Sequence, residues 1–411
     1  MWIILFFLIN IINLKELTMF SKELIVTNWN NFIILISIIF ILIIYFIKFD
    51  FLNNIEYIKN QTLFLLTIIT ANLIFYSRTL WLILIIIEIS VYPIIKIIMN
   101  QSKDEDKISS VKFIFIINIR GSLLIIWFIT KYRFLNFYIN LNRISYQNLA
   151  ETNLPIFLFF SFILLRKVPI IFLQFWLSKA HVAASGKCSI ILARVILKLG
   201  TYGIFKFSIV IIFLYKFLRE FLFSLNLIGL IIMRLLITRF SDIKLLVAYS
   251  SIMHIALRIP IIYHCSFLSI TGSIFIMVRH GLISACFFYL VTLIYELRLN
   301  RSIEINKRLE SYNKTLRLFI FSLIFINLGI PPFINFFSEI FYVRTFIKTS
   351  HIYLIFAIVT MVRIIIFCII ILIKNNLNKK MVKFNKNLNT NNISILLIPL
   401  TTVLYLPFFT E

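Results

Sequence analysis

The chain has 411 residues, of which 61% are hydrophobic and 14% are charged, and its mean hydropathy is +1.00. A soluble domain is about 45–50% apolar and about 25% charged, so these values exclude an ordinary soluble fold and predict one membrane domain over residues 1–411. The net charge of +25 would suggest nucleic acid in a soluble protein, but the basic residues gather in short connections between apolar runs, so we expect a lipid bilayer and no nucleic acid as partner.

Four single cysteines are spread along the chain and form no C-x-x-C pair: Cys188, Cys265, Cys286 and Cys368. This spacing argues against an iron–sulfur cluster, a structural zinc site and a disulfide framework. Nucleotide-binding and hydrolase motifs are missing in the context that they require. We therefore expect this chain to bind no cofactor and no metal.

Apolar runs of membrane-spanning length recur along the chain with short polar breaks. A helix needs about 20 apolar residues to cross a bilayer. Unbroken runs indicate helices, because a backbone in lipid must satisfy its own hydrogen bonds, and these runs lack the alternation of a membrane barrel. We predict an all-α polytopic bundle of about 12–13 transmembrane helices. The predicted spans are 1–13, 32–48, 62–77, 79–99, 111–130, 155–175, 189–215, 221–239, 243–263, 266–290, 316–346, 350–374 and 393–409.

Two candidate ionisable groups inside predicted spans are Glu88 and Lys198. An ionisable side chain in a spanning helix is costly, so each is a candidate for a proton site or a buried ion pair. The alternatives are a static polar contact for Glu88 and a lysine that snorkels to the interface for Lys198. Gly200 and Gly203 follow Lys198, which favours either a helix break or close helix packing at this point.

Further along the chain, Lys244 and His254 lie ten residues apart in one predicted span, with Tyr249, Ser250 and Ser251 between them. On a straight helix, ten residues rise about 15 Å. The hydroxyl groups can hold water, and histidine titrates near neutral pH. The cluster therefore favours a proton relay over a histidine that only makes a packing hydrogen bond.

His280 lies in the next apolar run, and Glu339 follows the pair Pro331-Pro332. Two adjacent prolines remove two backbone donors, so we predict a helix break whose free carbonyls face a cavity. A carboxylate shortly after such a break suits the exit of a proton channel. The alternative is an ordinary helix kink with Glu339 at the membrane–water interface. Together, the ionisable groups on separate helices predict a polar path through the bundle rather than a hydrolytic site.

Arginines also fall inside apolar runs, where each costs about 2.5–3.5 kcal/mol on insertion scales. These positions are Arg120, Arg194, Arg234, Arg258, Arg279 and Arg363. Some animal mitochondria read the codons AGA and AGG as serine, so a translation by another code would write arginine here. The codons or the peptide masses distinguish the two readings, and the predicted path leaves these side chains out.

Five segments carry a combined signature: residues 175–182, 191–203, 242–254, 279–285 and 327–339. In this order they resemble the antiporter-like subunits of mitochondrial respiratory complex I, the NADH:ubiquinone oxidoreductase (NADH dehydrogenase), and among them the subunit 4 family. The resemblance implies two inverted repeats with broken helices and an antiporter-like core at about 62–346. It also implies a multi-pass protein of the mitochondrial inner membrane.

The same resemblance implies a role for each ionisable residue. Glu88 would match the carboxylate that pairs with a broken-helix lysine, here Lys198. The remaining residues would be a central relay lysine, two relay histidines and a terminal proton-exchange carboxylate, which are Lys244, His254, His280 and Glu339.

The function implied is that of a proton-translocating subunit in a complex that couples NADH oxidation and ubiquinone reduction to proton transport. The chain itself would have no redox site, and NADH, FMN, iron–sulfur clusters and ubiquinone would be bound by partner subunits. Other membrane subunits of the complex, including sister antiporter-like subunits, would be its partners. The alternative is a cation/proton (Na⁺/H⁺) antiporter subunit without a redox partner, because Tyr-Ser-Ser-x-x-His also occurs in such antiporters. A membrane transferase is disfavoured, because acidic loop pairs for a metal–diphosphate substrate are missing.

Overall fold

A computed structural model gives the fold, which is helical in all the long elements that it describes. The described residues are 54–77, 80–100, 105–131, 162–168, 174–211, 239–256, 267–298, 300–302, 314–329, 331 and 333–347, with scattered positions from 220 to 237. The predicted spans 1–13, 32–48, 350–374 and 393–409 lie outside them. Apart from one isolated bridge between Asp242 and Ser302, the described residues form no strand pairing, and the all-α prediction is confirmed.

The first described helices are α3 (Asn54–Tyr76), α4 (Leu80–Asn100) and α5 (Glu105–Lys131). They present large apolar side chains to the outside. Leu65, Ile69 and Leu73 of α3 are 51–55% exposed and recur every four residues, so they share one face of the helix. An outward face of this kind suits acyl chains rather than water.

The middle of the chain supplies the interior of the bundle. It contains the segment 162–168, then α7 (Phe175–Ala183), α8 (Gly186–Ile191), the π-helical turn η2 (Leu192–Ile196) and α9 (Leu197–Ile211). Ser185 begins this helical run, because its Oγ accepts a hydrogen bond from the Cys188 N–H at 3.3 Å and satisfies a free donor of the first turn. All residues of η2 are buried.

The helix α9 runs without interruption through Gly200 and Gly203, so the expectation of a helix break at these glycines is wrong. The two glycines instead permit close helix packing, which was the second alternative that the sequence offered for them. A Cβ atom on Gly200 would lie 3.2 Å from the Cβ of Lys167, and one on Gly203 would lie 2.7 Å from the Cδ2 of Leu164. The glycines therefore let α9 approach the segment 162–168.

The last described helices are α11 (Ile243–Ala256), α13 (Phe267–Arg298), α16 (Lys314–Asn327) and α17 (Ile334–Ile347). Asp242 caps α11, because its Oδ1 accepts a hydrogen bond from the Lys244 N–H at 2.8 Å. The chain leaves the helical conformation between α16 and α17, where Gly329 has a φ of 75° and Pro331 lies in a turn. This is the place at which the two prolines predict a break, although Pro332 itself lies outside the described residues.

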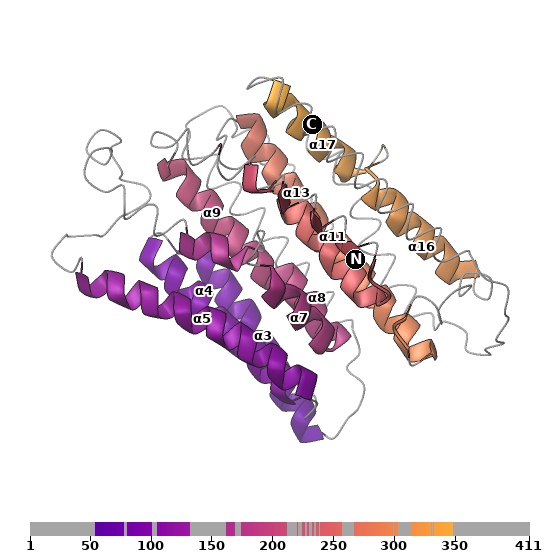
Figure 1. Cartoon of the computed structure of the whole chain (residues 1–411), viewed down its shortest axis with the longest axis horizontal. Helices are drawn as coiled ribbons and strands as arrows, with labels where there is room; N and C mark the ends of the chain where they lie inside the picture. Colours follow the sequence, from indigo (N-terminus) through magenta and orange to yellow (C-terminus); the bar gives the residue numbers. More distant parts are fainter. Residues whose placement is uncertain are drawn as a thin grey trace, which may run out of the picture.

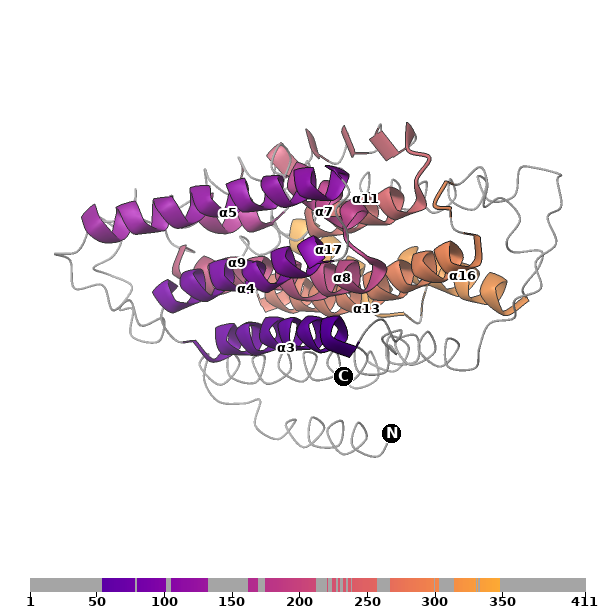
Figure 2. The ribbon, with the colours of Figure 1, turned by 90° about the horizontal axis from the view of Figure 1, so that it is seen from below.

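The helices lie roughly side by side, from α3, α4 and α5 at one end of the bundle to α16 and α17 at the other (Figure 1). In the second view α3 and α5 lie on opposite sides of α4 (Figure 2). Within the described residues, two helical stretches are long and apolar enough to cross a membrane, Leu82–Asn100 and Gly272–Glu296. In the apolar window of the second stretch 94% of the residues are buried, and His280 is among the buried residues of this helix.

Candidate functional site

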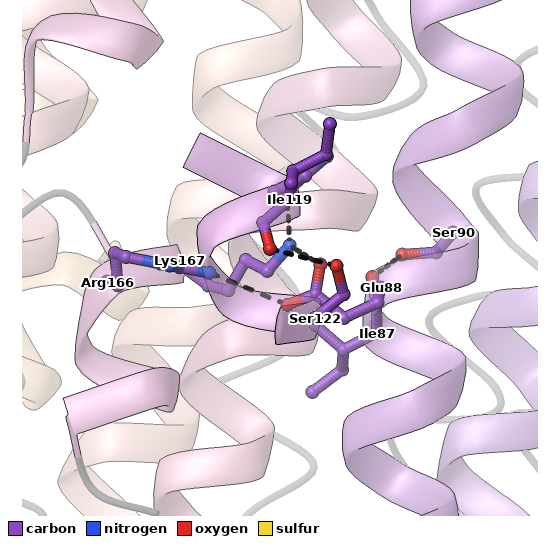
Figure 3. A network of polar contacts seen from close by, with 8 residues as sticks. Ile87, Glu88, Ser90, Ile119, Ser122, Arg166 and Lys167 are labelled. Carbon is purple, nitrogen blue, oxygen red and sulfur yellow. Dashed lines mark hydrogen bonds and ion pairs between the residues drawn. The ribbon is translucent and has the colours of Figure 1, made fainter. Parts of the chain in front are cut away.

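A buried ion pair joins α4 to the segment 162–168. The Nζ atom of Lys167 lies 2.9 Å from Oε2 of Glu88 and donates a second hydrogen bond of 2.5 Å to Oδ1 of Asn118 on α5. Arg166 adds a second cation, with its Nη2 atom 3.7 Å from Oε1 of Glu88. Figure 3 shows the side chains of Arg166 and Lys167 directed at the carboxylate of Glu88 on the neighbouring helix α4. The Glu88 side chain is 13% exposed and that of Lys167 only 4%, so the charges compensate one another away from solvent.

The structure corrects the expected partner of Glu88, which is Lys167 and not Lys198. The ammonium of Lys198 instead contacts the Ala193 carbonyl and the His280 ring. The sequence did contain a signal, since Arg166 and Lys167 are adjacent cations in the middle of the predicted span 155–175, directly before Val168 and Pro169.

Lys198 is buried within the bundle and does not snorkel to an interface. Its side chain folds back on η2, and its ammonium donates a hydrogen bond of 2.6 Å to the carbonyl oxygen of Ala193. It also lies 2.8 Å from Nδ1 of His280 on α13. An ammonium has only donors, so Nδ1 of His280 is the acceptor in this contact.

Lys244 is 2% exposed, and its ammonium donates a hydrogen bond to the carbonyl oxygen of Ala184. Ala184 is the residue that ends α7. The C-terminal end of a helix carries partial negative charge, so this end of α7 stabilises the ammonium in the interior.

His181 is a buried residue that the predicted path missed. Its ring stacks on Phe288 with 4.5 Å between centroids, and neither ring nitrogen has a hydrogen-bond partner among the described residues. The ammonium groups of Lys198 and Lys244 both lie close enough to act on it electrostatically. The signal for this residue was its place in the segment 175–182, where it was read only as part of a motif.

A polar cluster joins α11, α13, α16 and α17. The Nε2 atom of His254 lies 2.8 Å from Oδ1 of Asn327, and its Nδ1 atom lies 2.6 Å from Nη2 of Arg279. The Nη1 atom of Arg279 is 3.6 Å from Oε1 of Glu339. The rings of His254 and His280 are 6.4 Å apart between centroids. His254, Arg279, His280 and Asn327 line a cavity of about 10 Å³, which is room for about one water molecule.

These contacts form a row of titratable groups through the interior of the bundle. The pair of Glu88 and Lys167 lies at one end, where Lys167 packs against Gly200, two residues after Lys198. From Lys198 the contacts continue through His280 and His254. Arg279 connects it to Glu339, whose side chain is 21% exposed. Amine, imidazole and carboxyl groups in this order can pass a proton along the row with water in the gaps.

The other intramembrane arginines lie outside the row. Arg194 is buried in η2, and Arg120 is exposed on α5. Arg234, Arg258 and Arg363 fall outside the described residues. Within the described residues, no group of three or more His, Cys, Asp or Glu side chains is placed to hold a metal ion.

Comparison with known proteins identifies the family of the chain. The family described as "NADH:quinone oxidoreductase/Mrp antiporter, TM" matches residues 77–365. NADH-ubiquinone oxidoreductase chain 4 of Ceratitis capitata is 30% identical over 307 residues, which is 72% of this chain and 67% of that one. The same chain of Aedes aegypti is 30% identical over 64% of this chain, but the match spans 59% of the relative, less than two thirds of its length.

The fold is also found among solved structures. A chain of respiratory complex I from Thermus thermophilus superposes with a TM-score of 0.78 over 94% of this chain and 81% of that one, at 16% sequence identity. At this identity the likeness establishes the fold, an antiporter-like bundle of membrane helices. From the family match and the chain 4 relatives, we conclude that this multi-pass membrane protein belongs to the NADH:quinone oxidoreductase/Mrp antiporter family, in its NADH-ubiquinone oxidoreductase chain 4 branch.

Proposed function

We propose that this chain translocates protons as a membrane subunit of respiratory complex I in the mitochondrial inner membrane. It would couple NADH oxidation and ubiquinone reduction, which occur in partner subunits, to proton transport. The observation that carries the proposal is the buried row from Lys198 through His280 and His254 to Glu339. A purely structural helix bundle has no need of this row, because each ionisable group inside a membrane is unfavourable.

Charge coupling along the row supplies a mechanism. When Lys167 withdraws from Glu88, the carboxylate loses its nearest cation and gains affinity for a proton. The displaced ammonium then disfavours a proton on Lys198, which can release it to Nδ1 of His280 at 2.8 Å. A shift of one charge at the Glu88 end thereby drives a proton toward Glu339 at the other end.

The row contains proton-transfer groups alone, and we assign the redox chemistry to partners. NADH, FMN, the iron–sulfur clusters and ubiquinone would be held by other subunits of the complex. Sister antiporter-like subunits would flank this chain in the membrane. The names of its relatives, NADH-ubiquinone oxidoreductase chain 4, favour this assignment over a Na⁺/H⁺ antiporter without a redox partner.

The proposal is tested by replacing Lys198 with Met in the assembled complex in proteoliposomes. Protons moved per NADH oxidised are measured together with uptake of radioactive sodium. Positioned acid–base groups contribute about 10²- to 10⁴-fold to proton-transfer rates, so we expect proton movement through this chain to fall about 100-fold or more. Lys96→Met is the matched control, because Lys96 is exposed on α4.

Two results would overturn the proposal. An unchanged ratio of protons to NADH in Lys198→Met would remove this chain from the proton path. Sodium uptake driven by NADH oxidation and lost in Lys198→Met would identify a cation transporter. A chain that purifies with antiporter subunits and without any quinone reductase would support the alternative function.

A further inference from the structure

Arg279 is the feature of this chain that the proposed path leaves unexplained. It stands on α13 directly before His280, and its side chain is 3% exposed. Its guanidinium contacts two members of the path from different helices, His254 on α11 and Glu339 on α17. Asn327 at the end of α16 also bonds His254, and Ser250, Ser251 and Ser284 line the cavity beside it.

The contact with His254 fixes where the imidazole carries its proton. A guanidinium has five donors and no acceptor, so Nδ1 of His254 accepts from Nη2 of Arg279 at 2.6 Å. The proton of the neutral ring is then on Nε2, which donates to Oδ1 of Asn327 at 2.8 Å. In this arrangement the one lone pair with which His254 could take up a proton is already engaged by Arg279.

His254 can therefore accept a proton at Nδ1 only after Arg279 withdraws. The carboxylate of Glu339 lies 3.6 Å from Nη1, which is within ion-pair range but longer than a hydrogen bond. A charged Glu339 attracts the guanidinium away from the ring, whereas a protonated Glu339 does not. The cavity beside the two histidines has room for about one water molecule, which can reach Nδ1 once it is free.

We propose that Arg279 is a positioning residue that gates His254 according to the charge of Glu339. While Glu339 holds a proton, Arg279 stays hydrogen-bonded to His254, so His254 cannot accept another proton. After Glu339 releases its proton, Arg279 moves to the carboxylate and His254 becomes able to accept the next one. The gate would prevent protons from flowing back through the row between turnovers. This inference rests on the proposed function, because it assigns a direction to the same path.

The test measures the passive proton leak of proteoliposomes that hold the assembled complex without NADH, together with protons moved per NADH during turnover. We expect Arg279→Ser to raise the leak at least about fivefold, the lower end of ordinary coupling between sites, and to lower the ratio of protons to NADH. Arg279→Lys keeps a cation and should restore part of the gate. Arg344→Ser, an exposed arginine of α17, is the matched control.

The outcomes separate the gate from the path itself. Arg279→Ser could show a normal proton leak and a normal ratio of protons to NADH while Lys198→Met loses pumping. This result would overturn the gate and keep the proposed function. No effect in either variant would overturn both. If Arg279→Ser fails to assemble, Glu339→Gln gives a second test, because a permanently neutral carboxamide should leave Arg279 on His254 and lower the leak below that of the unmodified complex. An unchanged or raised leak in Glu339→Gln would overturn the gate.

The identity of residue 279 is a direct check on the same inference. The peptide mass over this part of α13 must show arginine. A mass that corresponds to serine at this position would overturn the gate and leave the row of Lys198, His280 and His254 as the path.

Discussion

The Nζ atom of Lys167 lies 2.9 Å from Oε2 of Glu88, although 79 positions separate the two residues in the chain. Removing one member of a buried pair leaves an uncompensated charge and costs about 3–5 kcal/mol, whereas replacing both is often close to neutral. Glu88 faces both Lys167 and Arg166, so Glu88→Gln leaves two buried cations without their counter-charge, whereas the double variant leaves one. We expect Glu88→Gln to lower the temperature of heat denaturation of the solubilised complex more than the double variant Glu88→Gln/Lys167→Met does.

Lys112→Met on the exposed face of α5 is the control for this comparison and should leave the denaturation temperature unchanged. If the two single substitutions add without any interaction in the double variant, the pair contributes no coupling and its place in the row is wrong.

Substitutions of His181 distinguish a role in proton relay from a role in packing. Its ring is fully buried and stacks on Phe288, so His181→Phe keeps an aromatic ring of similar shape and should preserve assembly. Phenylalanine has no titratable nitrogen. We expect proton movement through this chain to decrease about 100-fold or more if His181 passes protons between Lys198 and Lys244. Normal pumping in His181→Phe, with a loss of stability in His181→Ala, would identify a packing residue.

The sequence predicted the membrane bundle, the buried charges and the break near Pro331 for clear physical reasons. Apolar runs and missing backbone donors act locally, so they are visible in one chain. The partner of Glu88 could not be predicted this way, because the choice between Lys167 and Lys198 depends on how α4 packs against α9. Gly200 was ambiguous for the same reason, since a glycine that permits unwinding also permits close packing.

Gly200 controls how near the segment with Lys167 comes to α9. A Cβ atom there would lie 3.2 Å from both the Cβ of Lys167 and the Cγ2 of Val168. We expect Gly200→Val to cost about 1–3 kcal/mol through overpacking and to lower pumping by moving Lys167 away from Glu88. Gly203→Ala is the contrast, because its nearest neighbour is the flexible end of Leu164. Gly203→Ala should lower heat stability and leave the ratio of protons to NADH unchanged. Reduced pumping in Gly203→Ala together with normal pumping in Gly200→Val would contradict this account.

Gly329 shapes the break before Glu339 in two ways that can be measured separately. Its φ of 75° is unfavourable for other residues, and a Cβ atom would lie 2.6 Å from Oε2 of Glu339. We expect Gly329→Ala to destabilise the chain by about 1–3 kcal/mol from backbone strain alone. The same substitution beside Glu339→Ala should be milder, because the clash is removed. Equal effects in both backgrounds would show that the carboxyl group does not occupy this position.

The π-helical turn at Leu192–Ile196 makes the position of Lys198 depend on residue count as well as on residue type. A turn of this kind holds one residue more than an α-helical turn, and one residue corresponds to about 100° of rotation around the helix axis. An insertion or deletion that the widened turn does not absorb would swing the ammonium away from Ala193 and His280. Evolution can exchange side chains in this stretch, but insertions and deletions should be far less tolerated than in the loops.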